Sequence, residues 1–195
     1  MEFKQASECG ENIREDICKL FLEAFGEYFT IFSKDLGKLI KAFSHIFQLE
    51  YFYVCIINNE IVGMTALVDK GNNSIRLNKM EFVKYFGLLK GTFANIVLKK
   101  YLCKAPKYPV EINNKTGSIE FVATSKKFKK MGIATFLMEG IFSLNIYEKY
   151  ILEVADTNEP AYNLYQKLGY KEIVRIKPKY TKKYGINYFV YMLKE

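Results

Sequence analysis

A short basic segment carries the residue types that bind phosphate groups. It runs from Val122 to Thr135 and reads Val-Ala-Thr-Ser-Lys-Lys-Phe-Lys-Lys-Met-Gly-Ile-Ala-Thr. The pattern predicts a strand, a lysine-rich turn and a helix that begins near Gly132. Amides at a helix start lack intrahelical acceptors, and the helix dipole attracts negative charge there. Because Gly132 and Ala134 have little side-chain bulk, we expect a diphosphate to approach this backbone; the alternative is a solvated lysine turn before an ordinary amphipathic helix.

Two motifs together resemble the GNAT superfamily of acyl-CoA N-acyltransferases. Residues 129–134 read Lys-Lys-Met-Gly-Ile-Ala, similar to the family's (Arg/Gln)-x-x-Gly-x-(Gly/Ala) except for lysine at the first position. Residues 151–170 resemble the family's Leu-Glu-Val, Asn and Ala-x-x-Leu-Tyr-x-x-Leu-Gly-Phe pattern, with Tyr170 as the final aromatic residue. The motifs occur in the family's order. The resemblance implies one domain over 1–195, with a helical insertion at about 79–116.

The resemblance implies acetyl-CoA as the cosubstrate. In this family the strand before the loop pairs through its backbone with the pantetheine arm, and the loop amides bind the diphosphate. Asn158 is also a candidate helix N-cap. The expected coenzyme contacts are Val122, Ala123, Thr124, Lys129, Lys130, Met131, Gly132, Ile133, Ala134, Thr135, Asn158 and Tyr162.

Acyl transfer to an amine requires a group that removes the amine proton and a group that protonates the departing thiolate. Glu153 lies between Leu152 and Val154 on a predicted strand, so its side chain points away from theirs. If those two face the core, Glu153 faces the site, where the resemblance makes it the general base. The alternative is a carboxylate on a solvated strand face. Glu120 is a second candidate base, although its register does not match cleanly.

Tyr165 is the candidate general acid. In the family, the tyrosine of Leu-Tyr-x-x-Leu-Gly stands near the coenzyme sulfur, where it protonates the thiolate. The alternative is a packed aromatic residue with a hydrogen-bonded hydroxyl. No cysteine or serine has the setting of an activated nucleophile, so direct attack by the amine is expected.

Hydrophobic periodicity predicts an α+β fold. Helices are expected near 11–29, 36–47 (with Ser33 as N-cap), 79–103 (two helices meeting near Gly87 and Gly91), 132–147 and 160–168, and strands at 1–6, 51–57, 60–68, 118–124, 150–155, 171–176 and 188–193. The strand–helix–strand unit at 118–155 predicts a parallel crossover. The resemblance refines this to a three-layer α/β/α arrangement: a mixed, mostly antiparallel twisted sheet with splayed central strands.

The composition suits a folded globular protein, with 50% hydrophobic and 26% charged residues. The four cysteines are widely spread and His45 is the only histidine, so no metal site is expected. His45 is interpreted as structural. The first residues show no signal peptide and no apolar run is long enough to span a membrane, so a cytoplasmic protein is expected.

Other functions and partners stay open. A net charge of +8 also suits a nucleic-acid-binding protein, but the charge is almost all lysine, with only Arg14, Arg76 and Arg175 as arginines, and this interpretation ranks last. A catalytically silent acyl-CoA sensor of the same fold ranks second. The acceptor is a small-molecule or peptide amine. The sequence does not decide whether the chain forms a homodimer. The aromatic segment 79–103 is expected to pack in the core, with a substrate lid or a dimer face as alternatives.

Overall fold

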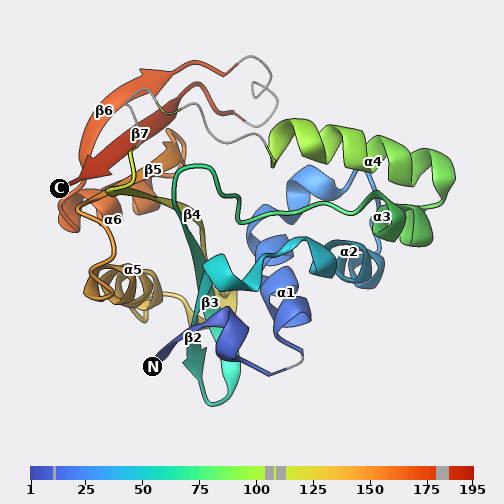
Figure 1. Cartoon of the computed structure of the whole chain (residues 1–195), viewed down its shortest axis with the longest axis horizontal. Helices are drawn as coiled ribbons and strands as arrows, with labels where there is room; N and C mark the ends of the chain where they lie inside the picture. The colour runs from blue at the N-terminus through green and yellow to red at the C-terminus, as the bar shows by residue number, and fades with distance from the viewer. Residues whose placement is uncertain (11, 104–107, 109–112, 179–184) are drawn as a thin grey trace.

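A single seven-stranded sheet organises the chain, with helices on both of its faces (Figure 1). The computed structural model describes residues 1–195 except 11, 104–107, 109–112 and 179–184. The strands are β1 (Glu2–Gln5), β2 (Phe52–Ile57), β3 (Glu60–Val68), β4 (Thr116–Thr124), β5 (Lys149–Ala155), β6 (Lys171–Ile176) and β7 (Phe189–Lys194). The α-helices are α1 (Ile13–Phe25), α2 (Leu36–Phe43), α3 (Lys79–Phe86), α4 (Leu88–Tyr101), α5 (Ile133–Ser143) and α6 (Glu159–Lys167).

The sheet order is β1-β2-β3-β4-β5-β7-β6, and every pair is antiparallel except β4 with β5. The predicted parallel crossover is therefore confirmed, with α5 as its helix. The β2–β3 hairpin turns at Asn58 and Asn59, whose φ values of +50° and +61° match the type I′ turn that suits the twist of a hairpin. The α+β class and the mixed, mostly antiparallel sheet are confirmed.

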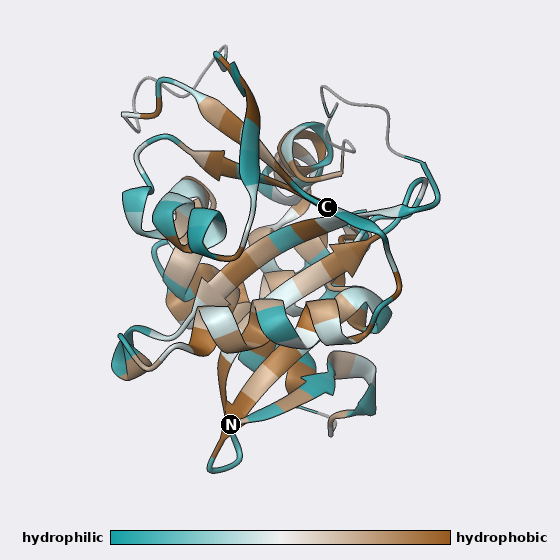
Figure 2. Ribbon diagram, turned by 90° about the vertical axis from the view of Figure 1, so that its left-hand side faces the viewer, coloured by the Kyte–Doolittle hydropathy of each residue, from teal (hydrophilic) through white to brown (hydrophobic). Residues whose placement is uncertain are grey.

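Separate apolar clusters fill the two faces of the sheet. On one face, α1 and α2 pack through aromatic side chains such as Phe21 and Phe43, both at most 1% exposed. On the other face, α5 contributes Leu137 and Met138, and the α6 residue Tyr165 joins the same cluster as Met138. Figure 2 shows apolar residues concentrated along the central strands, with polar residues toward the outside of the helices. The arrangement gives the expected three layers.

Some predicted boundaries were wrong. Ser33 is not the N-cap of α2: the Asp35 carboxylate accepts the Lys38 amide at 3.0 Å, while the Ser33 hydroxyl accepts the Asp35 amide. The periodic stretch to 47 continues past α2 as the 3-10 helix η3 (Ser44–Ile46), because the apolar spacing persists after the α-helical hydrogen bonds stop. For the same reason the first predicted helix ends at Phe25, and η2 (Gly26–Phe29) follows.

The segment 79–101 forms two helices joined at Gly87, whose φ is +82°. The two helices approach closely at Gly91, where an added Cβ would lie 2.5 Å from the Val83 backbone. The expectation of core packing holds for Phe82 and Phe86, which are buried. It fails for the outer face of α4, where Leu89, Phe93 and Ile96 are 87%, 53% and 61% exposed. The lid and the dimer face remain predictions.

His45 lies on η3, where Nε2 accepts the Asn78 amide at 3.0 Å and the ring packs edge-on against Phe82. Burial lowers its pKa. Within the described ranges, no helix combines the length and apolar content needed to cross a membrane.

Candidate active site

The central strands β4 and β5 separate where the candidate carboxylates begin. Their parallel pairing runs from Thr116 opposite Lys149 to Ile119 opposite Leu152. The next residue on each strand is a glutamate, Glu120 on β4 and Glu153 on β5. Beyond this point β4 stays paired with β3, and β5 stays paired with β7. Each of the two strands therefore keeps one backbone edge outside the ladder, which is the predicted splay.

A β-bulge in β4 directly follows Glu120. Met64 pairs with Ala123 and Ala66 pairs with Glu120, so β4 holds one more residue than β3 over this stretch. Phe121 has φ +53°, and its ring packs against Phe21 at a centroid distance of 5.7 Å. A bulge interrupts the alternation of side chains along a strand. This interruption explains why the register of Glu120 could not be matched from the sequence.

Glu120 sits in a hydroxyl network drawn from three segments. The Ser74 hydroxyl donates to Glu120 Oε2 at 2.6 Å, and the Ser118 hydroxyl lies 3.4 Å from Oε1. The Tyr108 hydroxyl in turn hydrogen-bonds the Ser118 hydroxyl. Burial raises the pKa of Glu120, the two serine hydrogen bonds act against that rise, and the nearby charge of Glu153 adds to it. The two carboxylates therefore interact electrostatically.

Glu153 faces away from the core, as predicted. Leu152 and Val154 are 1% and 5% exposed, whereas the Glu153 side chain reaches solvent. Tyr191 lies opposite Glu153 on β7, and its hydroxyl donates to the carboxylate. Partial desolvation by the surrounding protein raises the pKa of Glu153, and the hydrogen bond from Tyr191 opposes that rise. The Tyr108 ring meets the Tyr191 ring edge-on at 5.9 Å, which connects the surroundings of the two carboxylates.

Tyr165 is buried on α6, where its ring centroid lies 5.9 Å from that of Tyr170. Burial raises its pKa, so the hydroxyl keeps its proton at neutral pH. A protonated phenol suits proton donation, and it equally suits packing. The general-acid role therefore remains a prediction.

The predicted phosphate loop has the backbone shape of an anion site. Gly132 is the N-cap of α5 in the left-handed conformation, with φ +74°, and an added Cβ there would meet nothing within 4 Å. In the described part of the chain, the amides of Ile133, Ala134 and Thr135 have no assigned backbone acceptor, as the first turn of a helix requires. Lys130 is also left-handed, at φ +63°.

The side chains around the loop divide into exposed and engaged groups. Lys129, Lys130 and Met131 are exposed, whereas the Lys127 ammonium pairs with Glu60 at 2.8 Å. On the preceding strand, Ala123 and Thr124 pair with β3, and Val122 lies between them and the bulge. The other backbone edge of these residues faces the gap where β4 and β5 are no longer paired. The end of β4, the loop that follows it and the end of β5 therefore all lie beyond the point where β4 and β5 separate.

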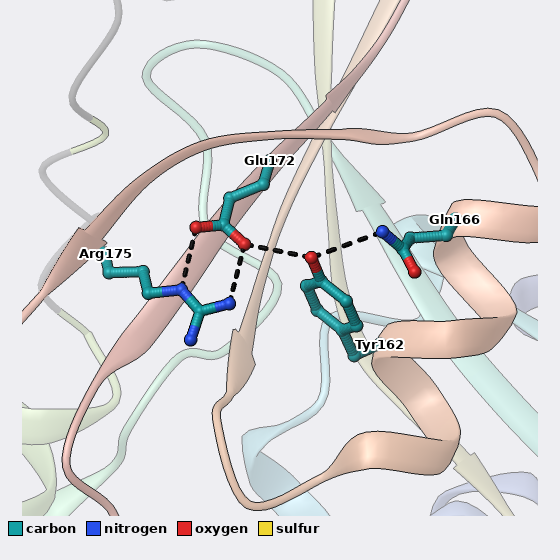
Figure 3. A network of polar contacts seen from close by, with 4 residues as sticks. All are labelled: Tyr162, Gln166, Glu172 and Arg175. Carbon is teal, nitrogen blue, oxygen red and sulfur yellow. Dashed lines mark hydrogen bonds and ion pairs between the residues drawn. The ribbon is translucent and has the colours of Figure 1, made fainter.

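Asn158 and Tyr162 already have partners within the protein. The Asn158 side chain caps α6 by accepting the Ala161 amide at 3.3 Å, which confirms the predicted N-cap. The Tyr162 hydroxyl donates to Glu172 at 3.0 Å and accepts from Gln166 at 3.3 Å, as Figure 3 shows. Glu172 also accepts two hydrogen bonds from Arg175, at 2.7 and 2.9 Å. The network joins α6 to β6; the coenzyme contacts of Asn158 and Tyr162 remain predictions.

The sequence reasoning missed four residues that contact the carboxylates or their partners: Ser74, Tyr108, Ser118 and Tyr191. Ser118 had a local signal, because it stands two residues before Glu120 and side chains repeat every second residue along a strand. Tyr191 could be placed beside Glu153 only with knowledge of the β5–β7 pairing. Ser74 and Tyr108 lie in irregular segments without any periodic pattern. Among the described residues, no group of three or more potential His, Cys, Asp or Glu metal ligands is found.

The chain is similar to known acetyltransferases. The profile of the Acetyltransferase (GNAT) family matches residues 14–170. An N-alpha-acetyltransferase of Sulfurisphaera tokodaii is 36% identical over 63 residues, a match that spans 30% of this chain and only 38% of that relative.

Solved structures show the same fold over the whole chain. An N-acetyltransferase from Staphylococcus aureus Mu50 aligns over 99% of this chain and 100% of its own, with a TM-score of 0.64 and 21% identity. The ribosomal-protein-S18-alanine N-acetyltransferase of Escherichia coli aligns over 99% and 92%, with a TM-score of 0.57 and 10% identity. The solved structures share the fold, and the family match over residues 14–170 shows that the chain belongs to the acetyltransferase (GNAT) family.

Proposed function

We propose that this protein transfers an acetyl group from acetyl-CoA to a primary amine by direct attack on the thioester. The observation that carries the proposal is the position of Glu153: its carboxylate lies at the point where β4 and β5 separate, on the strand joined by the crossover to the Gly132 loop. A coenzyme whose diphosphate binds the loop amides would extend its arm along the open strand edge toward this carboxylate.

In the proposed mechanism Glu153 accepts the amine proton, directly or through a water molecule. The amine nitrogen then bonds to the thioester carbon, the carbon–sulfur bond breaks, and Tyr165 protonates the thiolate. A raised pKa makes Glu153 a stronger base once it is ionised. Glu120 is the alternative base, and its serine hydrogen bonds hold it in place for that role as well.

Direct attack is supported by the condition of the cysteines. All four are free thiols, and burial raises the pKa of each. A thiol with a raised pKa is a poor nucleophile at neutral pH because little of it is thiolate. An acetyl-cysteine intermediate is therefore not part of the mechanism.

The proposed coenzyme contacts are the loop backbone from Lys129 to Thr135 and the strand end from Val122 to Thr124, with the Asn158 and Tyr162 side chains as further contacts. The acceptor is a small-molecule or peptide amine. Because one relative is named an N-alpha-acetyltransferase, a peptide N-terminus is the first acceptor class to assay. The proposal includes a single domain, a cytoplasmic location, for which the free thiols are the supporting feature, and no dependence on a metal.

The decisive experiment measures release of CoA thiol from acetyl-CoA with a panel of peptides and small amines. Wild-type protein is expected to turn over with at least one acceptor, and Glu153→Gln is expected to lose at least 100-fold in kcat, within the range for general-base catalysis. Acetyl-CoA affinity, measured by calorimetry, should be unchanged in Glu153→Gln. Tight coenzyme binding without turnover on any acceptor would identify a sensor instead, and salt-dependent nucleic-acid binding without coenzyme binding would contradict the proposal altogether.

A further inference from the structure

A second hollow lies away from the phosphate loop. Its volume is about 570 Å³, within the range of small-ligand sites. Its lining residues come from the first turn of α1, the segment that follows α2 and the start of α3. Arg14, Arg76 and Lys79 line it, with Glu50 as the carboxylate of the lining. The formal charge of these four side chains is positive.

The concentration of arginine in this hollow is unusual for the chain. Only three of the 29 basic residues are arginines, and two of them, Arg14 and Arg76, line the same hollow. The third, Arg175, is neutralised by its two hydrogen bonds to Glu172. Within the described ranges, no carboxylate forms an ion pair with Arg14 or Arg76. Two guanidinium groups without an acidic partner, at one concave place, match an oxyanion.

The walls of the hollow are held in position before any ligand arrives. Three hydrogen bonds do this: Arg14 Nη1 to the Phe47 carbonyl, the Arg76 amide to the Ile46 carbonyl at 2.8 Å, and the Asn78 amide to His45 Nε2 at 3.0 Å. The bond from Arg14 engages one nitrogen of its guanidinium and leaves the others for a ligand. A fixed frame reduces the entropy lost on binding.

The hollow is separate from the predicted diphosphate site in sequence and in lining. None of its lining residues belongs to the segment 122–135. It is connected to the candidate active site along the chain, because Arg76 stands two residues after Ser74, the donor to Glu120. An occupant would therefore touch the segment that holds one of the two carboxylates.

We propose that the Arg14–Arg76 hollow binds a small, freely diffusing ligand that carries a phosphate group. The two guanidinium forks recognise the phosphate oxygens and the Lys79 ammonium adds charge. This site does not depend on the acetyl-transfer proposal, because it is defined by binding alone.

The test is an NMR titration of the full-length protein with inorganic phosphate, in the presence of saturating CoA so that the loop is occupied. The amides of Arg76, Asn78 and Lys79 are expected to shift with one common dissociation constant. Arg14→Gln and Arg76→Gln should each weaken that constant at least fivefold, and the loss should grow as salt is lowered. Lys90→Gln removes an exposed charge from α4, outside the hollow, and should leave it unchanged.

Two outcomes would overturn the inference. One is a titration in which shifts appear only in the loop 126–135. The other is unchanged phosphate affinity in both arginine variants. Thermal unfolding of each variant shows whether it is folded. If a variant does not fold, the amides that shift in the wild-type protein still show whether phosphate binds at the hollow or only at the loop. Failure of acetyl transfer with an intact phosphate site would leave this inference standing, since the two readouts are independent.

Discussion

The roles of Glu153 and Glu120 can be distinguished by removing the hydroxyl group that hydrogen-bonds to each carboxylate. Tyr191→Phe deletes the hydrogen bond to Glu153, and Ser74→Ala deletes the 2.6 Å hydrogen bond to Glu120. Each hydrogen bond stabilises the ionised carboxylate and so lowers its pKa. Loss of the bond must therefore raise the pKa of that carboxylate more than the pKa of the other. A general base works only when ionised, so activity falls as the pH drops through its pKa, and a raised pKa moves this acidic limb to higher pH.

The size of the displacement follows from the hydrogen bond. A bond to a charged group contributes about 1.5–3 kcal/mol, and 1.36 kcal/mol corresponds to one pKa unit, or roughly a factor of ten in the ionised fraction below the pKa. The Glu153 side chain reaches solvent, so water replaces part of what Tyr191 provided. We therefore expect Tyr191→Phe to move the acidic limb of kcat/KM upward by about one pH unit.

The assay is kcat/KM against pH, followed by loss of thioester absorbance so that no pH-sensitive thiol reagent is needed. With Glu153 as the base, the limb moves in Tyr191→Phe and stays nearly in place in Ser74→Ala. The reverse result, a limb that moves in Ser74→Ala and not in Tyr191→Phe, would refute the assignment to Glu153 and transfer the role to Glu120. Unfolding temperatures of both variants provide the control for structural damage.

Three further experiments test separate parts of the molecule. Tyr165→Phe should lower kcat at least tenfold with little change in KM or in unfolding temperature; an unchanged kcat would leave Tyr165 a packing residue. Gly132→Ala and Gly71→Ala both place a Cβ in open space at positive φ, so each should cost about 1 kcal/mol of stability, but only Gly132→Ala should weaken acetyl-CoA binding, measured by calorimetry. Gly91→Ala should destabilise the fold by about 1–3 kcal/mol in urea unfolding, because its Cβ would lie 2.5 Å from the Val83 backbone; wild-type stability would contradict the close packing of α3 on α4.

The sequence predicted those features that depend on local patterns. The strands at 51–57 and 60–68 were predicted within one residue of their observed bounds, and the parallel crossover followed from the strand–helix–strand order at 118–155. Helix ends were less accurate. Ser33 and Asp35 are both good N-caps, and which of them begins α2 depends on tertiary packing that no short window contains.

The candidate site was predictable only as far as one strand could be read alone. Glu153 followed from alternation, because β5 is regular and its neighbours Leu152 and Val154 are buried. Glu120 shares a face with Ser118, as alternation predicts, but the extra residue at Phe121 shifts the residues that follow, so the register of Glu120 relative to the loop could not be read. A bulge of this kind has no signature without glycine in the left-handed position. The strain at Phe121 is offset by the aromatic packing of its ring, which the linear sequence does not display.

The two carboxylates have different surroundings just beyond the end of the β4–β5 ladder. In a regular β4, the residue after Ile119 would continue the ladder with β5, and Glu120 would stand directly beside Glu153 on one face. In this structure β4 leaves the ladder after Ile119. Glu120 accepts a hydrogen bond from Ser74 and lies near Ser118 on its own strand, while Glu153 keeps Tyr191. Two adjacent carboxylates with the same partners would share one proton, and their two pKa values would belong to the pair rather than to either residue. With different hydroxyl partners, each carboxylate has a hydrogen bond of its own that lowers its pKa, and this is why single hydroxyl deletions can tell them apart.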